Sequence, residues 1–268
     1  MPELPEVETI RRQLLPYCRG EQLAEIRFRT PGILKNSSIE EVTASLTGKT
    51  LTDIRRKGKF LVFDFQGNYL VVHLGMSGIF LKTETESRYP QHIHVEFHWC
   101  SSKSLYFQDM RKFGNIRFYP SPPEFPNVGI DPFDEELNEE RLYQLLARHK
   151  SNLKLFLMNQ AYIAGIGNIY ASEILYQAKL SPFRKTNEVS PAEAAILLDA
   201  IRQVLQKAIE RFGTTYSAYR TVNGTEGENQ HFLKVYQRND HPCPRCGERI
   251  VKTVLGNRSS FYCPRCQT

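Results

Sequence analysis

The sequence lacks any long hydrophobic run. Its 268 residues contain no apolar stretch close to the roughly 18 residues that a membrane-spanning helix needs. The amino terminus also lacks the charged-then-apolar order of a signal peptide, and no internal repeat is recognisable. These absences argue against a helical membrane protein and a repeat array. We therefore expect an intracellular globular protein with no membrane partner.

A strong excess of one charge sign is also missing. The formal net charge is +6 and the pI is near 8.9, so an anionic partner is permitted but not required. The chain is 41% hydrophobic, and by length it is most simply divided into two domains, each able to bury a core. The distribution of the basic residues is therefore more informative than their number.

Cysteine is scarce and unevenly placed. Cys18 and Cys100 are isolated and typical of inert core residues. The other four are Cys243, Cys246, Cys263 and Cys266, in two CPRC motifs that are separated by 16 residues. Two C-x2-C knuckles supply the four thiolates of a closed tetrahedral site, whereas disulfides are disfavoured in a reducing cytosol. The spacing predicts one structural Zn²⁺.

Periodicity divides the rest of the chain. A helix is predicted from about Pro5 to Cys18, followed by short β-branched and aromatic runs up to Tyr119, which predict an antiparallel β-sandwich or barrel. A proline-rich stretch from Ser121 to Pro132 marks a boundary. Helices then follow, the clearest starting with the capping box at Ser190, and 231–237 is predicted as a strand that leads into the zinc module. A long loop is predicted from Gly213 to Gln230.

The first residues, MPELPEVET, allow two interpretations. If Met1 is removed, Pro2 becomes a secondary amine with a pKa near that of an α-amino group, about 8, which is a plausible nucleophile at neutral pH. Alternatively, Pro2 and Pro5 simply start a helix whose first turn carries acidic residues. The residues alone leave both interpretations open.

Three other stretches are compatible with DNA binding, each with a structural alternative. The turn AGIGN can offer backbone N–H groups to a phosphate or merely separate packed helices. DMRKFGN can form a wedge that fills the space of an extruded base, or a hairpin with Phe113 in the core. The zinc module, residues 241–268, carries five basic residues and one acid, with Arg258 near the tip of a hairpin.

Taken together, these motifs resemble the formamidopyrimidine-DNA glycosylase family of bacterial base-excision enzymes. PELPEVET, KGKFL, HLGMSG, DMRKFGN, AGIGNIYASE, FLKVYQR and the two CPRC motifs match in order from residue 2 to 267. The resemblance implies an α+β fold: an N-terminal antiparallel β-sandwich with flanking helices, then a helical helix–two-turn–helix domain with a four-cysteine zinc-finger β-hairpin. We expect domains at residues 1–130, 131–235 and 236–268.

The resemblance also implies a function and roles for single residues. The expected enzyme excises oxidised purines, 8-oxoguanine and formamidopyrimidines, from duplex DNA and cleaves the strand as a lyase through a proline imine with β,δ-elimination. The implied catalytic residues are Pro2 as nucleophile, Glu3 as proton shuttle, Lys59 as phosphate contact and acid, and Glu6 as support of the N-terminal segment. The implied DNA contacts are of two kinds. Met76, Arg111 and Phe113 fill the space that the extruded base leaves in the duplex. Asn168 and Arg258 contact backbone phosphates, and His92 and Lys154 are further candidates for that role.

The sequence departs from the family pattern in the lesion-capping loop. Ser217 and Ala218 occupy the positions at which many relatives carry an Arg-Asp pair, which leaves the preferred base open. Three alternatives remain: an endonuclease VIII-like enzyme for oxidised pyrimidines, a catalytically silent protein that binds damaged DNA, and a zinc-ribbon protein that acts on RNA or proteins. Leu4 and the wedge favour the purine enzyme. We expect a monomer that works on lesion-containing or abasic double-stranded DNA in the bacterial cytoplasm, associated with the nucleoid.

Overall fold

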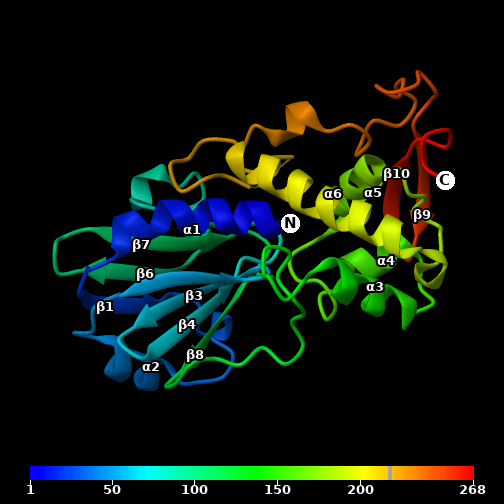
Figure 1. The fold of residues 1–268 in the computed structure, drawn as a ribbon. Helices are drawn as coiled ribbons and strands as arrows, with labels where there is room; N and C mark the ends of the chain where they lie inside the picture. Colours follow the sequence, from blue (N-terminus) through cyan, green and yellow to red (C-terminus); the bar gives the residue numbers. More distant parts are fainter. Residues whose placement is uncertain (217–218) are drawn as a thin grey trace. The chain divides into compact units, whose positions relative to one another are not determined.

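The computed structural model describes residues 1–216 and 219–268, and their contacts group into two units (Figure 1). Unit 1 consists of Met1–Phe125 and Arg211–Gln230, and unit 2 of Pro126–Glu210 and His231–Thr268. The expected α+β fold is confirmed: unit 1 contains antiparallel sheets, and unit 2 contains helices and a β-hairpin. The domain limits expected at residues 130 and 235 stay predictions, and the contacts assign 211–230 to unit 1.

Unit 1 is built on two four-stranded antiparallel sheets. One has the order β1 (Leu23–Phe28), β6 (Ile93–Trp99), β7 (Ser104–Asp109) and β5 (Gly78–Leu81), and the other has β2 (Asp53–Lys57), β3 (Phe60–Phe65), β4 (Asn68–His73) and β8 (Asn115–Tyr119). Phe63 of one sheet lies 5.9 Å from Phe80 and 6.2 Å from Phe97 of the other, between ring centroids. The sheets therefore pack face to face as the expected sandwich.

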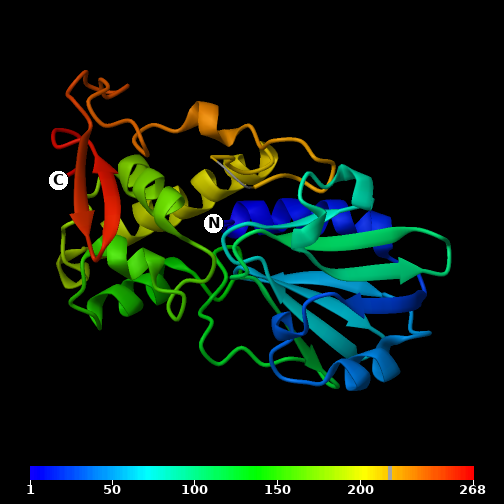
Figure 2. The ribbon, with the colours of Figure 1, turned by 180° about the vertical axis from the view of Figure 1, so that it is seen from behind.

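Two helices complete unit 1. Helix α1 (Leu4–Cys18) lies beside the strands in both ribbon views and buries Val7, Ile10 and Leu14 completely (Figures 1 and 2). Helix α2 (Ile39–Leu46) is capped by the Ser38 side chain, which accepts a hydrogen bond from the Glu41 N–H at 3.1 Å. Helix α1 agrees with the helix predicted from the sequence to within one residue, whereas α2 was not predicted.

Unit 2 contains four α-helices and one hairpin within the described residues. They are α3 (Glu139–Ala147), α4 (Leu153–Met158), α5 (Asn168–Ala178), α6 (Pro191–Glu210), β9 (Val251–Leu255) and β10 (Arg258–Tyr262). The capping box at the start of α6 is confirmed, because Ser190 Oγ accepts from the Glu193 N–H at 3.3 Å and Glu193 Oε2 accepts from the Ser190 N–H at 2.9 Å. None of the helices among the described residues is long and apolar enough to cross a membrane.

The strand predicted at 231–237 is wrong. The chain forms a short 3₁₀ helix, η5 (Asn229–Phe232), and then an irregular segment. The N–H groups of Lys234, Val235 and Tyr236 donate to the Glu173 carboxylate of α5 at 2.8–2.9 Å. Because one buried carboxylate takes three successive donors, these residues need no neighbouring strand to satisfy their backbone.

Candidate active site and nucleic-acid interface

The start of α1 is held by two buried glutamates. The capping box links Glu3 and Glu6: the Glu3 side chain accepts from the Glu6 N–H, and Glu6 Oε2 accepts from the Glu3 N–H at 2.7 Å. Pro2 directly precedes this box and is buried, with Met1 half exposed in front of it. The box therefore fixes the backbone on the carboxyl side of Pro2, and removal of Met1 would convert the proline amide nitrogen into an amine.

Glu6 also holds a segment from the other end of unit 1. Its Oε1 accepts a hydrogen bond from the Thr214 N–H at 2.7 Å, so its two oxygens join residues separated by more than 200 positions. The neighbouring Gly213 has φ +79°, and a Cβ there would lie 2.8 Å from Glu6 Oε1. Only glycine combines this backbone conformation with such a close approach. Ser217 and Ala218, at the positions that leave the preferred base open, lie outside the described residues.

Lys59 occupies the tight turn between β2 and β3. Lys57 pairs with Phe60, and the two residues between them, Gly58 and Lys59, form the turn, with φ +56° at Gly58. Lys59 is only 7% exposed. Arg55, Arg56 and Lys57 belong to the edge strand β2 and Lys59 to its hairpin turn, so this run of four bases is not only the solvated charge cluster that such a run usually indicates.

His73 is a neighbour of Lys59 to which the sequence analysis assigned no role. It lies opposite Phe60 in the β3–β4 register, and the two ring centroids are 5.0 Å apart. Burial and the positive charge of Lys59 lower the pKa of His73 to about 4. The imidazole is therefore neutral at pH 7, and its Nδ1 accepts a hydrogen bond from the Gly75 N–H at 3.1 Å.

The wedge residues are exposed on two loops of unit 1. Met76 is 36% and Phe113 is 54% exposed, and the Arg111 guanidinium carbon lies 4.9 Å from the centre of the Phe113 ring. The alternative that placed Phe113 in the core is therefore wrong. Exposed apolar side chains with a stacked guanidinium are the features that an intercalating wedge requires.

A single buried carboxylate, that of Asp109, holds both wedge loops. It accepts from the Gly114 N–H at 2.6 Å, the Arg111 N–H at 3.2 Å and the Ser77 hydroxyl. Ser77 Oγ in turn accepts from the Arg111 N–H at 3.0 Å. Asp109 was part of the DMRKFGN motif, but its sequence position gave no indication of this role.

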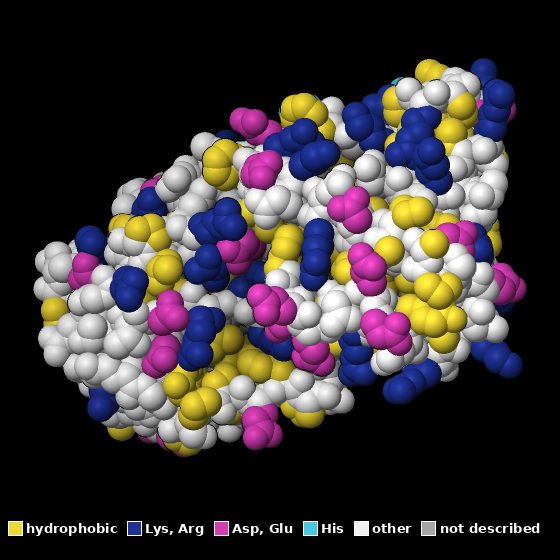
Figure 3. Space-filling model, in the orientation of Figure 1, with side chains coloured by type: hydrophobic (Ala, Val, Ile, Leu, Met, Phe, Trp, Pro, Cys, Tyr) yellow, Lys and Arg dark blue, Asp and Glu magenta, His cyan; other side chains and the backbone are white. Residues whose placement is uncertain are grey.

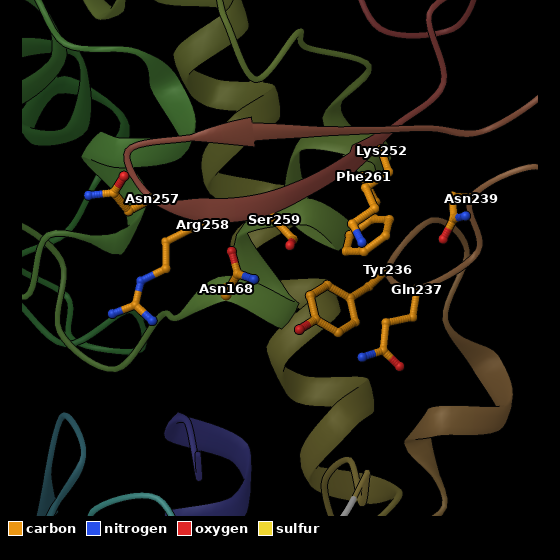
Figure 4. A pocket seen from close by; sticks show the side chains of 9 residues that line it. All are labelled: Asn168, Tyr236, Gln237, Asn239, Lys252, Asn257, Arg258, Ser259 and Phe261. Carbon is orange, nitrogen blue, oxygen red and sulfur yellow. The ribbon is translucent and has the colours of Figure 1, made fainter.

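Asn168 and Arg258 line one polar cavity of about 580 Å³ in unit 2 (Figure 4). Asn168 is the first residue of α5, and its Oδ1 is buried without a hydrogen-bond partner among the described residues. Arg258 begins β10, directly after the hairpin tip. Tyr236, Gln237, Asn239, Lys252, Asn257, Ser259 and Phe261 also line the cavity. The start of a helix, an arginine and a lysine around one cavity suit an anionic ligand.

The AGIGN turn before α5 is shaped by Gln160. Its Oε1 accepts from the Gly165 N–H at 2.9 Å, and its Nε2 donates to the Ile166 carbonyl at 2.7 Å. Gly165 has φ +93°. The glycine turn is thus a specific structure that delivers Asn168 at the start of the helix. Its contact with a phosphate stays a prediction.

The two further candidates occupy different surroundings. His92 ends the 3₁₀ helix η3 (Pro90–His92) of unit 1, where its Nδ1 is buried without a partner among the described residues. Lys154 is fully buried in unit 2, and its ammonium donates to the Ser259 carbonyl at 2.8 Å and to Ser172 Oγ at 3.2 Å. In this structure Lys154 therefore supports strand β10 at Ser259, the residue after Arg258. Its phosphate contact stays a prediction.

The four C-terminal cysteines form a metal site. All their sulfur atoms lie within 4.8 Å of one another, with 3.9 Å between Cys243 and Cys266 and 3.5 Å between Cys246 and Cys263. Tetrahedral Zn–S bonds of about 2.3 Å place sulfurs about 3.8 Å apart, so the cluster fits one structural Zn²⁺. The site ties β9 and β10 to both knuckles. Lys and Arg side chains gather at this end of unit 2 (Figure 3).

Comparison with known families and structures covers almost the whole chain. Residues 1–116 match the formamidopyrimidine-DNA glycosylase N-terminal domain, 128–220 match its H2TH domain, and 240–268 match the zinc finger found in FPG and IleRS. A formamidopyrimidine-DNA glycosylase from Symbiobacterium thermophilum is 40% identical over all of this chain and 89% of its own length.

Two solved structures are similar over nearly their full length. MutM (Fpg) from Thermus thermophilus is 36% identical with a TM-score of 0.89, and the match covers 99% of this chain and 98% of that one. Wild-type Lactococcus lactis Fpg (MutM), in complex with N7-benzyl-Fapy-dG-containing DNA, is 32% identical with a TM-score of 0.91 and complete coverage of both chains.

Proposed function

Because this chain belongs to the formamidopyrimidine-DNA glycosylase family, we propose that it excises oxidised purines from duplex DNA and then cleaves the strand at the abasic site. The observation that carries this proposal is the buried Glu3–Glu6 capping box directly after Pro2. An N-terminal helix does not need two buried carboxylates at its first turn, whereas an amine nucleophile needs a fixed backbone and a proton acceptor nearby.

In the proposed reaction the Pro2 amine, freed by removal of Met1, attacks C1′ of the damaged nucleotide. The nitrogen–C1′ bond forms as the bond from C1′ to the base breaks, and the base leaves with a proton. Glu3 shuttles protons during opening of the sugar ring, which gives a protonated imine. β-Elimination and δ-elimination then expel the 3′ and 5′ phosphates, with Lys59 as an acid and phosphate contact.

DNA recognition is divided among the groups described above. Met76, Arg111 and Phe113 are proposed to fill the void that the extruded base leaves, which offsets part of the few kcal/mol that extrusion costs. Asn168 and Arg258 are proposed to hold backbone phosphates, as the polar cavity between them supports. We place this activity in the bacterial cytoplasm and expect a monomer that associates with the nucleoid.

The test is to trap the imine. Protein with Met1 confirmed absent by mass spectrometry is incubated with a duplex that contains 8-oxoguanine opposite cytosine, and borohydride is added. We expect a covalent adduct that is absent when Met1 is retained. Pro2→Gly provides a matched control, because it keeps a free α-amine and should trap more slowly, while an acetylated amino terminus should trap nothing.

The same assay separates the second candidate. Ser217 and Ala218 replace the pair that many relatives carry, so the lesion preference is open to an endonuclease VIII-like specificity for oxidised pyrimidines. An adduct with thymine glycol or an abasic site, but none with 8-oxoguanine, would favour that candidate. No adduct with any of these duplexes would contradict the proposed chemistry and leave a binding protein.

A further inference from the structure

Glu8 of α1 is surrounded by three guanidinium groups. Its Oε1 accepts from Arg11 and Arg12 at 2.8 Å, and its Oε2 accepts from Arg11 at 2.9 Å and from Arg56 at 3.2 Å. Arg11 and Arg12 belong to the same helix, but Arg56 comes from β2. The Arg56–Glu8 pair, in which both side chains are about 90% buried, therefore ties the helix to the β2–β3 hairpin.

Arg56 also reaches the turn that carries Lys59. While Nε donates to Glu8, Nη1 donates to the Gly58 carbonyl at 3.2 Å. That carbonyl belongs to the peptide bond that joins Gly58 to Lys59. Its orientation is therefore linked through one planar guanidinium to a carboxylate on α1. A lysine side chain has a flexible four-carbon stem, so the position of its backbone decides which region the ammonium can reach.

The register of these contacts brings Lys59 toward the start of α1. Arg11 Nη1 contacts the Ile54 carbonyl at 3.5 Å, and Arg56 contacts Glu8. Strand β2 and helix α1 therefore run in opposite directions, and the residues after Arg56 face the residues before Glu8. From Glu8 to Glu3 the helix rises about 7.5 Å at 1.5 Å per residue. The three residues from Arg56 to Lys59 span at most about 10 Å. The hairpin turn that carries Lys59 therefore lies on the side of β2 that faces the first turns of α1.

We propose that the Glu8–Arg56 ion pair is a positioning device that sets Lys59 opposite the Pro2–Glu3 end of α1. The inference rests on the proposed function, because it gives Lys59 its task through that site. Arg56 acts through Lys59 and does not itself touch the reacting atoms. Neither Glu8 nor Arg56 was identified from the sequence, where Arg56 was one base in a charged run.

The test is a double-mutant cycle between Arg56 and Lys59. Arg56→Lys keeps the positive charge but lacks the rigid planar fork that holds Nε on Glu8 and Nη1 on the Gly58 carbonyl. With an abasic duplex at saturation, the single-turnover rate of borohydride trapping should fall about tenfold in the Lys59 protein, but less than about twofold in the Lys59→Met protein. Equal losses in both backgrounds, or no loss in either, would overturn the positioning role.

Arg55→Lys is the matched control. Arg55 is adjacent on β2, but its exposed side chain pairs with Asp53 and Asp64 and makes no contact with Glu8 in the described contacts. The trapping rate should change less than about twofold. A loss equal to that of Arg56→Lys would show that any lysine on this strand is harmful and would contradict the specific pairing.

Amide hydrogen exchange gives a readout that does not depend on activity. Arg56→Lys should speed exchange at residues 57–60 by about tenfold while leaving residues 68–73 of β4 unchanged, and Arg55→Lys should change neither. Unchanged exchange at 57–60 would overturn the positioning role even if trapping slowed. A complete absence of adduct in the unmutated protein would instead contradict the proposed function, and the exchange result would still decide the role of Arg56.

Discussion

Replacement of Asp109 by asparagine should loosen both wedge loops at once. The Asp109 carboxylate is fully buried, with one oxygen facing the Gly114 N–H and the other facing the Arg111 N–H and the Ser77 hydroxyl. Asparagine keeps the shape of the side chain but turns one of these oxygens into a donor. A hydroxyl can rotate to accept, but a backbone N–H cannot. If the amide nitrogen faces Gly114, that N–H loses its acceptor. If it faces Arg111, that N–H keeps Ser77 Oγ as an acceptor, and what is lost is the charge of the group that held both loops.

The size of the effect follows from these contacts. A hydrogen bond to a charged group contributes about 1.5–3 kcal/mol, and a buried donor without a partner costs about 1–3 kcal/mol. Because the amide can take the orientation in which Ser77 Oγ still accepts from the Arg111 N–H, the main loss is that of bonds to a charged group, and we expect Asp109→Asn to lower the free energy of unfolding of unit 1 by about 2 kcal/mol. The exposed loops should also lose the arrangement in which Arg111 stacks on Phe113.

The single tryptophan makes the measurement specific. Trp99 is buried in the core of unit 1, stacked near Phe65 and Phe97, so its fluorescence during urea unfolding reports on this unit. The control is Asp53→Asn, a partly exposed carboxylate of the same unit, which should change stability by less than about 1 kcal/mol. A change of less than about 0.5 kcal/mol for Asp109→Asn would refute the reasoning, since that is within the ordinary range of surface substitutions.

Three more predictions concern other parts of the molecule. Gly75→Ala should destabilise unit 1 by about 1–3 kcal/mol in urea unfolding, because φ is +62° and the new Cβ would lie 2.4 Å from the Gly114 nitrogen. Cys266→Ala should abolish stoichiometric zinc measured by atomic absorption and raise amide exchange at residues 240–268, with β4 unaffected. Burial raises the pKa of Glu8, but Arg11, Arg12 and Arg56 outweigh it and hold that pKa at about 2, below the ordinary 4.5. Its stabilising contribution is therefore complete above pH 4.5 and lost as the pH falls toward 2, so Glu8→Gln should flatten the fall in melting temperature across that range.

Features with a local cause could be predicted from the sequence. The zinc site follows from two C-x2-C knuckles, and the start of α6 follows from Ser190 and Glu193, three residues apart. The turn between β3 and β4 contains Gln66 and Gly67, both with positive φ, and glycine is the residue type that favours this conformation. In each case the residues that decide the structure are neighbours in the sequence.

Features with a distant cause could not be predicted. The 231–237 segment has the composition of a strand, but its N–H donors go to Glu173, about 60 residues earlier. Strand β2 was missed because it lies at a sheet edge and buries only Ile54, which leaves charged residues as the visible pattern. Likewise, the family motifs indicated Lys59 and Phe113, but Arg56 and Asp109 support them through contacts with Glu8 and Ser77, which are 48 and 32 residues away in the sequence.

The bond between Glu6 and Thr214 has a consequence for biosynthesis. The ribosome makes α1 first, but the N–H group that satisfies Glu6 Oε1 is added 208 residues later, after all four α-helices of unit 2. A second long-range bond, from the Val222 N–H to Gln13 Oε1 at 2.8 Å, spans 209 residues. At about 5–20 residues per second, the nascent chain waits for at least about ten seconds before these bonds can form. During that time Glu6 Oε1 and Gln13 Oε1 lack these two donors, and a chain that ends before residue 214 can form neither bond.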